Sequence, residues 1–356
     1  MKKLLLSLSL LAALVGFNAC STDVELYADY KDIPIVYGLL DASQDTNYIR
    51  INRAFSGSND HPINAHEIAL IADSSNYPGK LTAYLVEYKL GYGNNYYPTG
   101  DKALLDTITI HDKEEGFFYS PDQKVYFTDG KTIDGKPLYG NNNVDSKYLY
   151  KLIVLKGNDT VSAETGLVGG DNFKIITAGL SFNPEPSDKT QRILFTPADY
   201  AVFYDVKAVF YYHESHDGGP WVDKEVSFSI GPKSIEQLVF DEHNNYFVSY
   251  PENLLFSLLA EAIGGDTVVN PQHPNVVRYF DEKPMEVFVA AGGDELYNFI
   301  QVNQQTGFSQ TIPDYTNIKG GYGVFSSRIN LRKQVKISST TSIGLYGKEA
   351  WGFKQQ

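Results

Sequence analysis

The clearest strand pair in the sequence lies at residues 148–165, which read YLYKLIVLKGNDTVSAET. Its first half is a run of aliphatic and aromatic side chains, a composition typical of a β-strand. Gly157 and Asn158 then supply the positive φ angles of a tight turn, and the chain resumes as a second strand at Thr160. The stretch therefore predicts a β-hairpin.

Similar runs, broken by Gly, Asn, Asp and Pro, lie on both sides of this hairpin. Before it we predict strands at residues 33–40, 48–55 and 81–90, and after it the longest strand candidate of the chain, residues 201–212. The strands are irregularly spaced, and no helical pattern occurs before about residue 250. This arrangement predicts a β-sandwich of the immunoglobulin or fibronectin type.

A domain boundary is predicted near residues 166–190, where several glycines precede the linker-like sequence NPEPSD. The first domain, residues 33–170, is the predicted immunoglobulin- or fibronectin-like sandwich. The second domain, residues 171–356, is predicted to be β-rich. Its first hairpin would join residues 201–212 to residues 226–230 across a Gly-Gly-Pro turn.

The second domain also carries the helical signals of the chain. Ser249 and Glu252 match a capping box, and leucines at helical spacing follow them, so we predict a helix near residues 250–263. A Gly-Gly pair would end this helix. A second helix is predicted to start at Asp294. The predicted fold is thus mainly β, with one or two helices in its second half.

The amino-terminal residues predict where the protein resides. Lys2 and Lys3 precede an uncharged, mostly apolar run from Leu4 to Gly16. A membrane-spanning helix needs about 20 apolar residues, so this run is too short to be one. We interpret residues 1–19 as a secretory signal peptide.

Cys20 follows Ala19 at the predicted cleavage point, as in a bacterial lipoprotein. Acyl chains on Cys20 would anchor the mature protein to a membrane, with residues 20–32 as a tether. The polar, acidic residues after Cys20 resemble the stretch that directs many lipoproteins of the Bacteroidetes to the cell surface, a resemblance that implies surface exposure. The alternative is an ordinary cleaved signal peptide followed by an incidental cysteine.

Several short motifs resemble a known family. They are Cys20 with the acidic residues after it, IVYGLLD at residues 35–41, the strand pair at 150–165, Tyr204-Asp205-Val206, and GVFSSR at 323–328. Together they are similar to uncharacterised lipoproteins of the Bacteroidetes. The resemblance implies an outer-membrane lipoprotein of a kind often found beside TonB-dependent transporters or other large outer-membrane barrels, which makes such a barrel the expected partner. It supplies no catalytic residues.

The composition excludes several classes of protein. The chain has 43 acidic and 30 basic side chains, a formal net charge of -13, whereas a nucleic-acid binder needs a basic face. Cys20 is the only cysteine, which excludes a disulfide scaffold and a thiolate-built zinc or iron–sulfur site. An apolar fraction of 42% is too high for a disordered chain.

Residues 92–143 contain few long apolar runs, and we interpret them as long loops between strands, where binding functions commonly lie. Tyr92, Tyr96 and Tyr97 are candidate recognition residues for a glycan or a protein, because tyrosine offers rigid amphipathic contact area. Trp221, after the Gly-Gly-Pro turn, is another candidate. The alternative is that these are ordinary aromatic residues of strands and edges.

The sequence HESHD at residues 213–217 is the nearest match to a metal site. His213 and His216, with a carboxylate between them, could hold zinc or copper. The alternative, which we favour, is a solvated loop that happens to contain two histidines. We therefore predict neither a metal nor a cofactor.

No nucleophile elbow, P-loop or other catalytic motif is present in the sequence. We predict a non-enzymatic outer-membrane lipoprotein, exposed at the cell surface or facing the periplasm, that serves as an accessory or binding subunit of an outer-membrane β-barrel complex. The complex would be either a nutrient importer or an assembly or secretion machine. A stand-alone adhesin that binds glycans or proteins is the first alternative. A hydrolase with paired catalytic carboxylates is the second.

Overall fold

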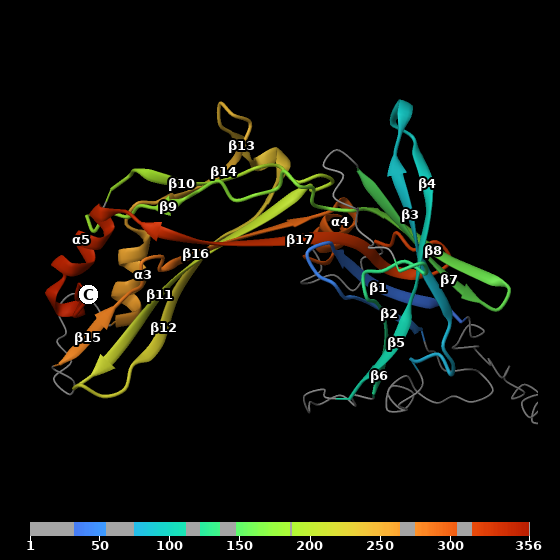
Figure 1. The fold of residues 1–356 in the computed structure, drawn as a ribbon, viewed down its shortest axis with the longest axis horizontal. Coiled ribbons are helices and arrows are strands. Elements are labelled where there is room, and N and C mark those ends of the chain that lie inside the picture. The colour runs from blue at the N-terminus through green and yellow to red at the C-terminus, as the bar shows by residue number, and fades with distance from the viewer. Residues whose placement is uncertain are drawn as a thin grey trace, which may run out of the picture.

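Strands dominate the protein, as the sequence predicts. The computed structural model describes residues 32–54, 75–111, 122–135, 147–185, 187–263, 275–304 and 315–355. They form two lobes along the long axis of the molecule (Figure 1). We call residues 32–170 with 315–328 the N-terminal lobe, and residues 171–304 with 329–355 the C-terminal lobe.

The N-terminal lobe contains β1 (Pro34–Asp41), β2 (Asn47–Arg53), β3 (Thr82–Leu90), the short 3-10 helix η1 (Tyr92–Asn94), β4 (Tyr96–Leu104), β5 (Asp106–Ile110), β6 (Gln123–Thr128), β7 (Tyr148–Lys156) and β8 (Asp159–Gly166). The C-terminal lobe contains β9 (Gly179–Leu180), β10 (Thr190–Phe195), β11 (Phe203–His216), β12 (Val222–Ser234), η2 (Ile235–Gln237), β13 (Val239–Phe240), β14 (Tyr246–Pro251), α3 (Leu254–Ile263), β15 (Val276–Tyr279), β16 (Met285–Gly292), α4 (Asp294–Gln304), α5 (Ser339–Gly347) and η3 (Glu349–Trp351). One strand, β17 (Tyr322–Ile337), belongs to both lobes.

Two sheets face each other in the N-terminal lobe. One has the strand order β17-β1-β2-β6-β5 and the other the order β4-β3-β7-β8. Successive side chains of a strand point to opposite faces, so the apolar positions of each sheet meet in one core. Val36, Ile49, Leu85 and Leu152 are almost completely buried there. The lobe is a β-sandwich, as predicted.

The C-terminal lobe is built on four long strands in the order β12-β11-β16-β17. Strands β10, β14 and β13 form a smaller sheet, and its side chains share a core with the long strands and with α3. Phe195, Phe210, Leu259 and Trp351 are almost completely buried in this core. The opposite face of the long sheet carries more polar and exposed side chains, such as Lys207, Tyr211 and His213 of β11.

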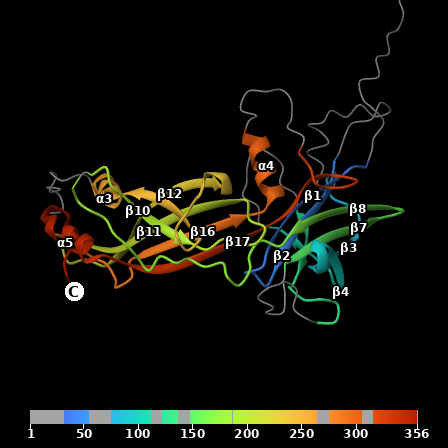
Figure 2. The same cartoon turned by 90° about the horizontal axis from the view of Figure 1, so that it is seen from above.

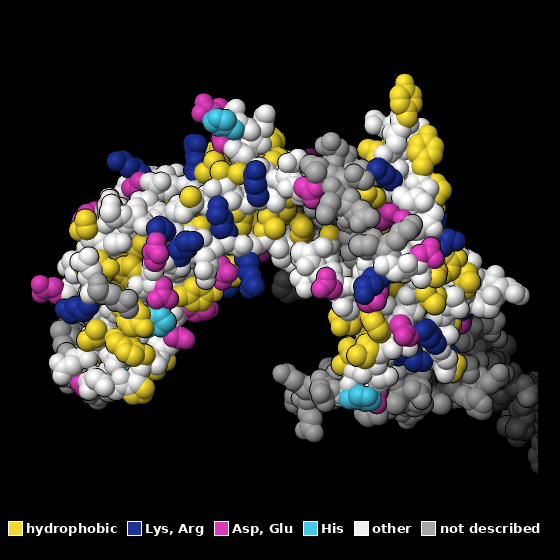
Figure 3. Space-filling view, in the orientation of Figure 1, with side chains coloured by type: hydrophobic (Ala, Val, Ile, Leu, Met, Phe, Trp, Pro, Cys, Tyr) yellow, Lys and Arg dark blue, Asp and Glu magenta, His cyan; other side chains and the backbone are white. Residues whose placement is uncertain are grey.

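Strand β17 joins the two lobes into one continuous sheet. Its first half pairs in parallel with β1, from Ile35 opposite Tyr322 to Asp41 opposite Arg328. Its second half pairs antiparallel with β16, from Gly292 opposite Arg328 to Met285 opposite Val335. Figure 1 shows β17 running from one lobe to the other, and Figure 3 shows the hollow that lies between the lobes beneath it.

Gly323 allows β17 to approach β1 closely. Its φ is +112°, and a Cβ atom there would lie 2.0 Å from the carbonyl oxygen of Val36. No other residue type has a side chain small enough for that distance, and few adopt that backbone conformation. The close pairing of β17 with β1 thus requires glycine at position 323.

Helix α4 lies where the lobes meet and stands out from the sheet in Figure 2. Its Glu295 carboxylate accepts hydrogen bonds from the hydroxyls of Thr165 (2.9 Å) and Ser326 (2.8 Å). Burial raises the pKa of Glu295 more than these hydrogen bonds lower it. Next to this group, the Ser327 hydroxyl donates to the carbonyl oxygen of Gly166 at 2.5 Å. These bonds tie β8 and α4 to the middle of β17.

Both predicted hairpins are confirmed. Strands β7 and β8 pair from Leu149 opposite Gly166 to Lys156 opposite Asp159. Strands β11 and β12 pair from Phe203 opposite Ser234 to Glu214 opposite Val222, with one bulge after Val206. Helix α4 begins at the predicted residue.

The prediction of long loops over residues 92–143 is wrong for its described parts, which contain β4, β5 and β6. Strands β4 and β5 lie at the edges of their sheets. Edge strands bury few side chains, and Ala103 is the one buried residue of β4. The long apolar run that identifies a central strand is therefore missing from their sequence.

The predicted capping box is also wrong. Ser249 lies in β14, opposite Arg192 of β10, and α3 begins only at Leu254. The Glu252 carboxylate accepts a hydrogen bond from the Gln191 side chain at 2.7 Å instead. Ser249, whose spacing to Glu252 matches a helix start, is thus part of a strand, because it pairs with β10. The helix itself, residues 254–263, lies within the predicted range.

Candidate functional site

The HESHD segment is the end of β11, and strand alternation separates its two histidines. His213 lies on the solvent-facing side of the long sheet, whereas Glu214 is buried on the core side. His216 is three residues from His213 and thus on the opposite face, where its Nε2 lies 2.8 Å from the Glu214 carboxylate. The two histidines therefore cannot hold one metal ion. Among the described residues, no group of three or more His, Cys, Asp or Glu side chains is arranged to hold a metal.

His213 lies between two carboxylates. Its Nδ1 is 2.7 Å from Oδ1 of Asp223 on β12, and its Nε2 is 3.5 Å from Oδ2 of Asp281, just after β15. The Asp223 side chain is 91% exposed and that of Asp281 is 71% exposed. One oxygen of each carboxylate thus contacts the imidazole, while most of the group faces solvent.

Aromatic rings adjoin this group. The His213 ring stacks on Tyr279 of β15, with centroids 4.5 Å apart and an interplanar angle of 28°. Trp221, which is 50% exposed, packs edge-on against the same tyrosine at 4.7 Å. Two residues that the sequence singles out for different reasons, His213 and Trp221, therefore meet around a third. We call Trp221, Tyr279, His213, Asp223 and Asp281 the aromatic–carboxylate cluster.

A buried ion pair lies beneath this cluster. Arg278 of β15 is opposite Glu214 of β11, and its Nη2 lies 2.6 Å from Oε2 of that carboxylate. The arginine also donates from Nη1 to the carbonyl oxygen of Trp351 at 2.5 Å. Burial raises the pKa of Glu214, but the hydrogen bonds from His216 and Arg278 outweigh it and lower the pKa overall. This pair holds β15, and with it Tyr279, in register against β11.

A cavity of about 240 Å³ opens beside the cluster. Its lining includes His213, Asp223 and Asp281 together with Lys224, Lys283, Gln334 and Tyr211. Figure 3 shows acidic, basic and hydrophobic side chains mixed on the surface of the C-terminal lobe over β11 and β12. The arrangement offers hydrogen-bond donors and acceptors next to ring surfaces.

The tyrosine-rich segment forms the tip of the β3–β4 hairpin, which projects from the N-terminal lobe (Figure 1). Tyr92 is 97% exposed and Tyr97 is 52% exposed. Tyr96 differs, because its hydroxyl forms a hydrogen bond with the hydroxyl of Tyr200 and its ring is half-buried. Tyr92 and Tyr97 are therefore exposed, whereas Tyr96 connects the hairpin to Tyr200, three residues before β11.

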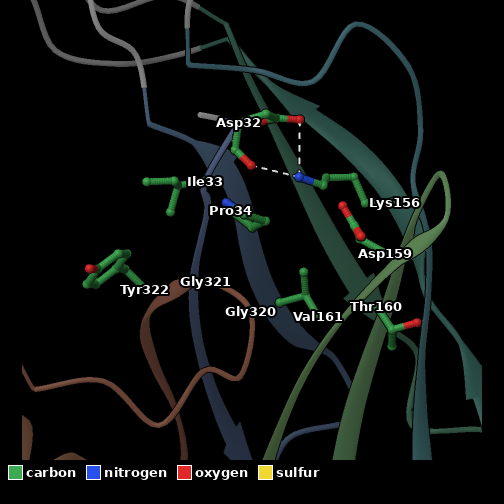
Figure 4. A pocket seen from close by; sticks show the side chains of 10 residues that line it. All are labelled: Asp32, Ile33, Pro34, Lys156, Asp159, Thr160, Val161, Gly320, Gly321 and Tyr322. Atoms are coloured by element: carbon green, nitrogen blue, oxygen red, sulfur yellow. Dashed lines mark hydrogen bonds and ion pairs between the residues drawn. The ribbon is translucent and has the colours of Figure 1, made fainter. Parts of the chain in front are cut away.

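A second cavity, of about 430 Å³, lies where residue 32 joins the N-terminal lobe (Figure 4). Lys156 crosses it: its Nζ donates to the backbone carbonyl of Asp32 at 2.7 Å and lies 3.4 Å from the Asp32 carboxylate. Gly320, Gly321 and Tyr322 form the facing wall. The point at which the predicted tether meets the sandwich is thereby held in place.

Two motifs that lie near opposite ends of the sequence are direct neighbours in the fold. The stretch 35–41, IVYGLLD, and the start of β17, which includes GVFSSR at 323–328, are the parallel pair of the shared sheet. The lipidation candidate, Cys20, lies outside the described residues. No helix in the described part of the chain has the length and apolarity needed to cross a membrane.

No protein-family model matches the chain, and a search of curated proteins finds no match. The site must therefore be interpreted from its own geometry. Of the cluster, the sequence indicates Trp221 and His213 but not Tyr279, Asp223 or Asp281. Tyr279 and Asp281 come from a segment well beyond β12 in the sequence, and no local pattern links them to β11.

Proposed function

We propose that this protein is a non-enzymatic binding subunit, anchored to the outer membrane through acylated Cys20, that works beside a β-barrel partner. The anchor is supported by the short apolar run before Cys20 and by the small residue at the predicted cut. The barrel partner is supported by the resemblance of the 35–41 and 323–328 motifs to Bacteroidetes lipoproteins. In the fold, these two motifs form one parallel strand pair in the N-terminal lobe.

The exposed tip of the β3–β4 hairpin is the observation that favours a protein partner. Tyrosine is enriched at the energetic centres of protein interfaces, because it adds apolar area and a hydroxyl at a low cost in side-chain entropy. Tyr92 and Tyr97 present this chemistry at the tip. The hydrogen bond between Tyr96 and Tyr200 supports the hairpin from one side, so little ordering would be needed on binding.

The outer strand of the same lobe adds a second apolar surface. Strand β5 lies at the edge of the N-terminal lobe's sheet β17-β1-β2-β6-β5. Its Ile108 and Ile110 are exposed, as is Leu104 just before it. An edge strand with exposed apolar side chains is a place where another chain can pair or pack. Hairpin and edge both belong to the lobe that carries the predicted tether.

The proposal is tested by affinity purification of the full chain from native membranes in mild detergent, followed by mass spectrometry. The wild-type chain is expected to bring down one outer-membrane β-barrel in near-stoichiometric amount. Tyr92→Ser combined with Tyr97→Ser should reduce that recovery about tenfold, because each removes an aromatic contact. Ile343→Ser, an exposed apolar residue of α5, is the control and should change nothing.

Cys20→Ser tests the anchor separately. The variant should leave the membrane fraction, while its melting temperature stays that of the wild type. Sedimentation of this variant with the envelope would contradict the acyl anchor. Recovery of the wild-type chain without any barrel protein would contradict the proposed partner.

A further inference from the structure

We infer that the aromatic–carboxylate cluster at the end of β11 is a second binding site, and that its ligand is a neutral, polyhydroxylated molecule such as a glycan chain. This site is independent of the proposed barrel partner, since it lies in the other lobe. In Figure 1 the N-terminal lobe occupies one end of the molecule, and β15, which carries Tyr279, lies at the other. An anchored protein would thus hold this site away from its point of attachment.

The rings supply a stacking surface. Tyr279 is covered on one face by His213 and contacted edge-on by Trp221. The two rings are nearly perpendicular, at 80°, so Tyr279 leaves at least one broad face of the indole uncovered, and half of the Trp221 surface is accessible. Sugar rings carry one face of C–H groups, which pack well on an aromatic face, whereas their hydroxyls need polar partners at the side.

The carboxylates supply those partners. Asp223 and Asp281 are each directed by a contact to His213, which uses one oxygen of each group. Two oxygens with a fixed direction can accept hydrogen bonds from neighbouring hydroxyls of one ring. Hydrogen bonds to an ionised acceptor are roughly twice as strong as bonds between neutral groups. An ordered pair of carboxylates beside an exposed indole is therefore suited to a ligand with several hydroxyls.

The charges of the lining exclude strongly ionic ligands. Lys224 and Lys283 line the same cavity as Asp223 and Asp281, so cations and anions each meet groups of their own sign. Gln334 and the Tyr211 hydroxyl add neutral hydrogen-bonding groups to the lining. A hydroxyl both donates and accepts, so a neutral polyol can use the carboxylates and the ammonium groups at once.

The size of the cavity indicates how much of the ligand it holds. Its volume of about 240 Å³ lies below the range of roughly 300–1,000 Å³ that is usual for drug-sized ligands. It fits a single small ring, with further units of a chain passing over Trp221 outside. The ion pair between Arg278 and Glu214 fixes β15 from beneath, which keeps the rings in place before the ligand arrives.

The test uses the full chain in detergent on an array of immobilised oligosaccharides. The array carries neutral glucose-, galactose-, mannose- and N-acetylglucosamine-containing chains, sulfated and sialylated chains, and basic peptides. Binding to at least one neutral chain is expected. Its affinity is then measured by isothermal titration calorimetry, which needs no fluorophore and so applies equally to a variant that lacks Trp221.

Trp221→Ala and Asp223→Asn should each weaken binding of that oligosaccharide about tenfold. The Asp223 side chain is almost fully exposed, so its variant keeps the fold even where the tryptophan variant does not. Phe240→Ala, a half-exposed aromatic of the same lobe, is the matched control and should bind as the wild type does.

Three results would overturn the inference. They are an array without neutral binders, binding restricted to sulfated chains or basic peptides, and affinity that both cluster variants leave unchanged. Release of free sugar from a bound chain would contradict a purely binding site, and would favour catalysis by the two carboxylates instead.

Discussion

The two lobes differ in how their sheets are completed. The C-terminal lobe takes its long sheet from β11 and β12, which are joined by a short turn, and from β16 and the second half of β17, which follow later in the same half of the chain. The N-terminal lobe needs β17, which comes near the end of the chain and pairs in parallel with β1, the first strand. One lobe is thus held mainly by local pairing and the other by a contact between distant parts of the chain.

This difference indicates which contacts the stability of each lobe depends on. Pairing between distant segments carries a larger entropy cost of chain closure, so it depends on close packing once formed. In the N-terminal lobe that packing rests on glycine at the start of β17. In the C-terminal lobe, a buried ion pair fixes the short strand β15 against β11.

Gly323→Ala should have the largest effect and should act on the N-terminal lobe. The new Cβ would lie 2.0 Å from the Val36 carbonyl oxygen, in a backbone conformation that alanine disfavours, so β17 must separate from β1. We expect a loss of about 3 kcal/mol or more in the free energy of unfolding. Hydrogen exchange should quicken in residues 34–53 and much less in β11 and β12.

Gly79→Ala is the control, because nothing lies within 4 Å of a Cβ atom at that position. Its exchange pattern should match that of the wild type. Equal loss of protection in both lobes of the Gly323→Ala variant would show that they unfold as one unit, and would contradict the comparison.

Arg278→Ala should have the next largest effect and should act on the C-terminal lobe. It leaves the buried Glu214 carboxylate without its main partner, which costs about 3 kcal/mol at neutral pH. The lowered pKa of Glu214 means that its stabilising contribution is complete above the ordinary value of 4.5 and is lost as the pH falls through the folded pKa. The deficit of the variant in urea unfolding should therefore shrink in acid.

Lys336→Ala removes an ion pair with Glu282 whose side chains are both exposed, and serves as the control. It should leave the unfolding curve unchanged within error. A deficit of Arg278→Ala that is the same at neutral and acid pH would contradict the assignment of Glu214 as its ionised partner.

Glu295→Gln should have a smaller effect, on the junction between the lobes. Because the folded pKa of Glu295 is raised, the folded state holds its proton above pH 4.5 while the unfolded state loses it. The wild type should therefore lose stability as the pH rises through this window. Glutamine can keep the contacts to Thr165 and Ser326 but does not titrate. The stability of the variant should therefore fall less than that of the wild type as the pH rises through this window.

The measurement is the melting temperature of wild type and variant across the pH range from 4 upward, about half a unit at a time. Glu349→Gln, on the short helix η3, provides a comparison at a carboxylate far from the junction. Parallel curves for the wild type and Glu295→Gln would contradict a raised pKa at the junction.

Tyr92→Ser should have the smallest effect on stability. Its side chain is almost fully exposed at the hairpin tip, so the free energy of unfolding should stay within about 0.5 kcal/mol of the wild type. Tyr96→Phe, which removes the hydroxyl bonded to Tyr200, should cost more, about 1 kcal/mol. A larger loss for Tyr92→Ser in urea unfolding would show that the tip is structural.

Local patterns predict the local parts of this fold. The hairpins β7–β8 and β11–β12 have their turn residues and their strands within one short stretch, so composition alone identifies them. Helix α5 is missed because its sequence, STTSIGLYG, has no apolar stripe. Ser338 instead caps it by accepting from the N–H of Thr341, whose hydroxyl donates to the carbonyl oxygen of Phe182. Those stabilising contacts exist only after β9 and β17 are in place.

The same limit applies to the candidate site. Trp221 and His213 can be noticed in the sequence, because an aromatic after a Gly-Gly-Pro turn and a histidine pair are visible patterns. Their interpretation as separate features fails, since Tyr279 joins them only in the folded sheet. The two histidines cannot share a metal ion because side chains three residues apart on a strand point to opposite faces of the sheet.

From its sequence alone, this chain is determined to be a mainly β protein, acidic, without disulfides, and with strands and turns at recognisable places. Short-range physics suffices for that, because side-chain alternation and turn conformations involve only neighbouring residues. The course of β17 through both lobes, and the meeting of three rings with two carboxylates, are set by packing between segments far apart in the chain. Such contacts depend on which surfaces fit together in space, and no single stretch of sequence contains both partners.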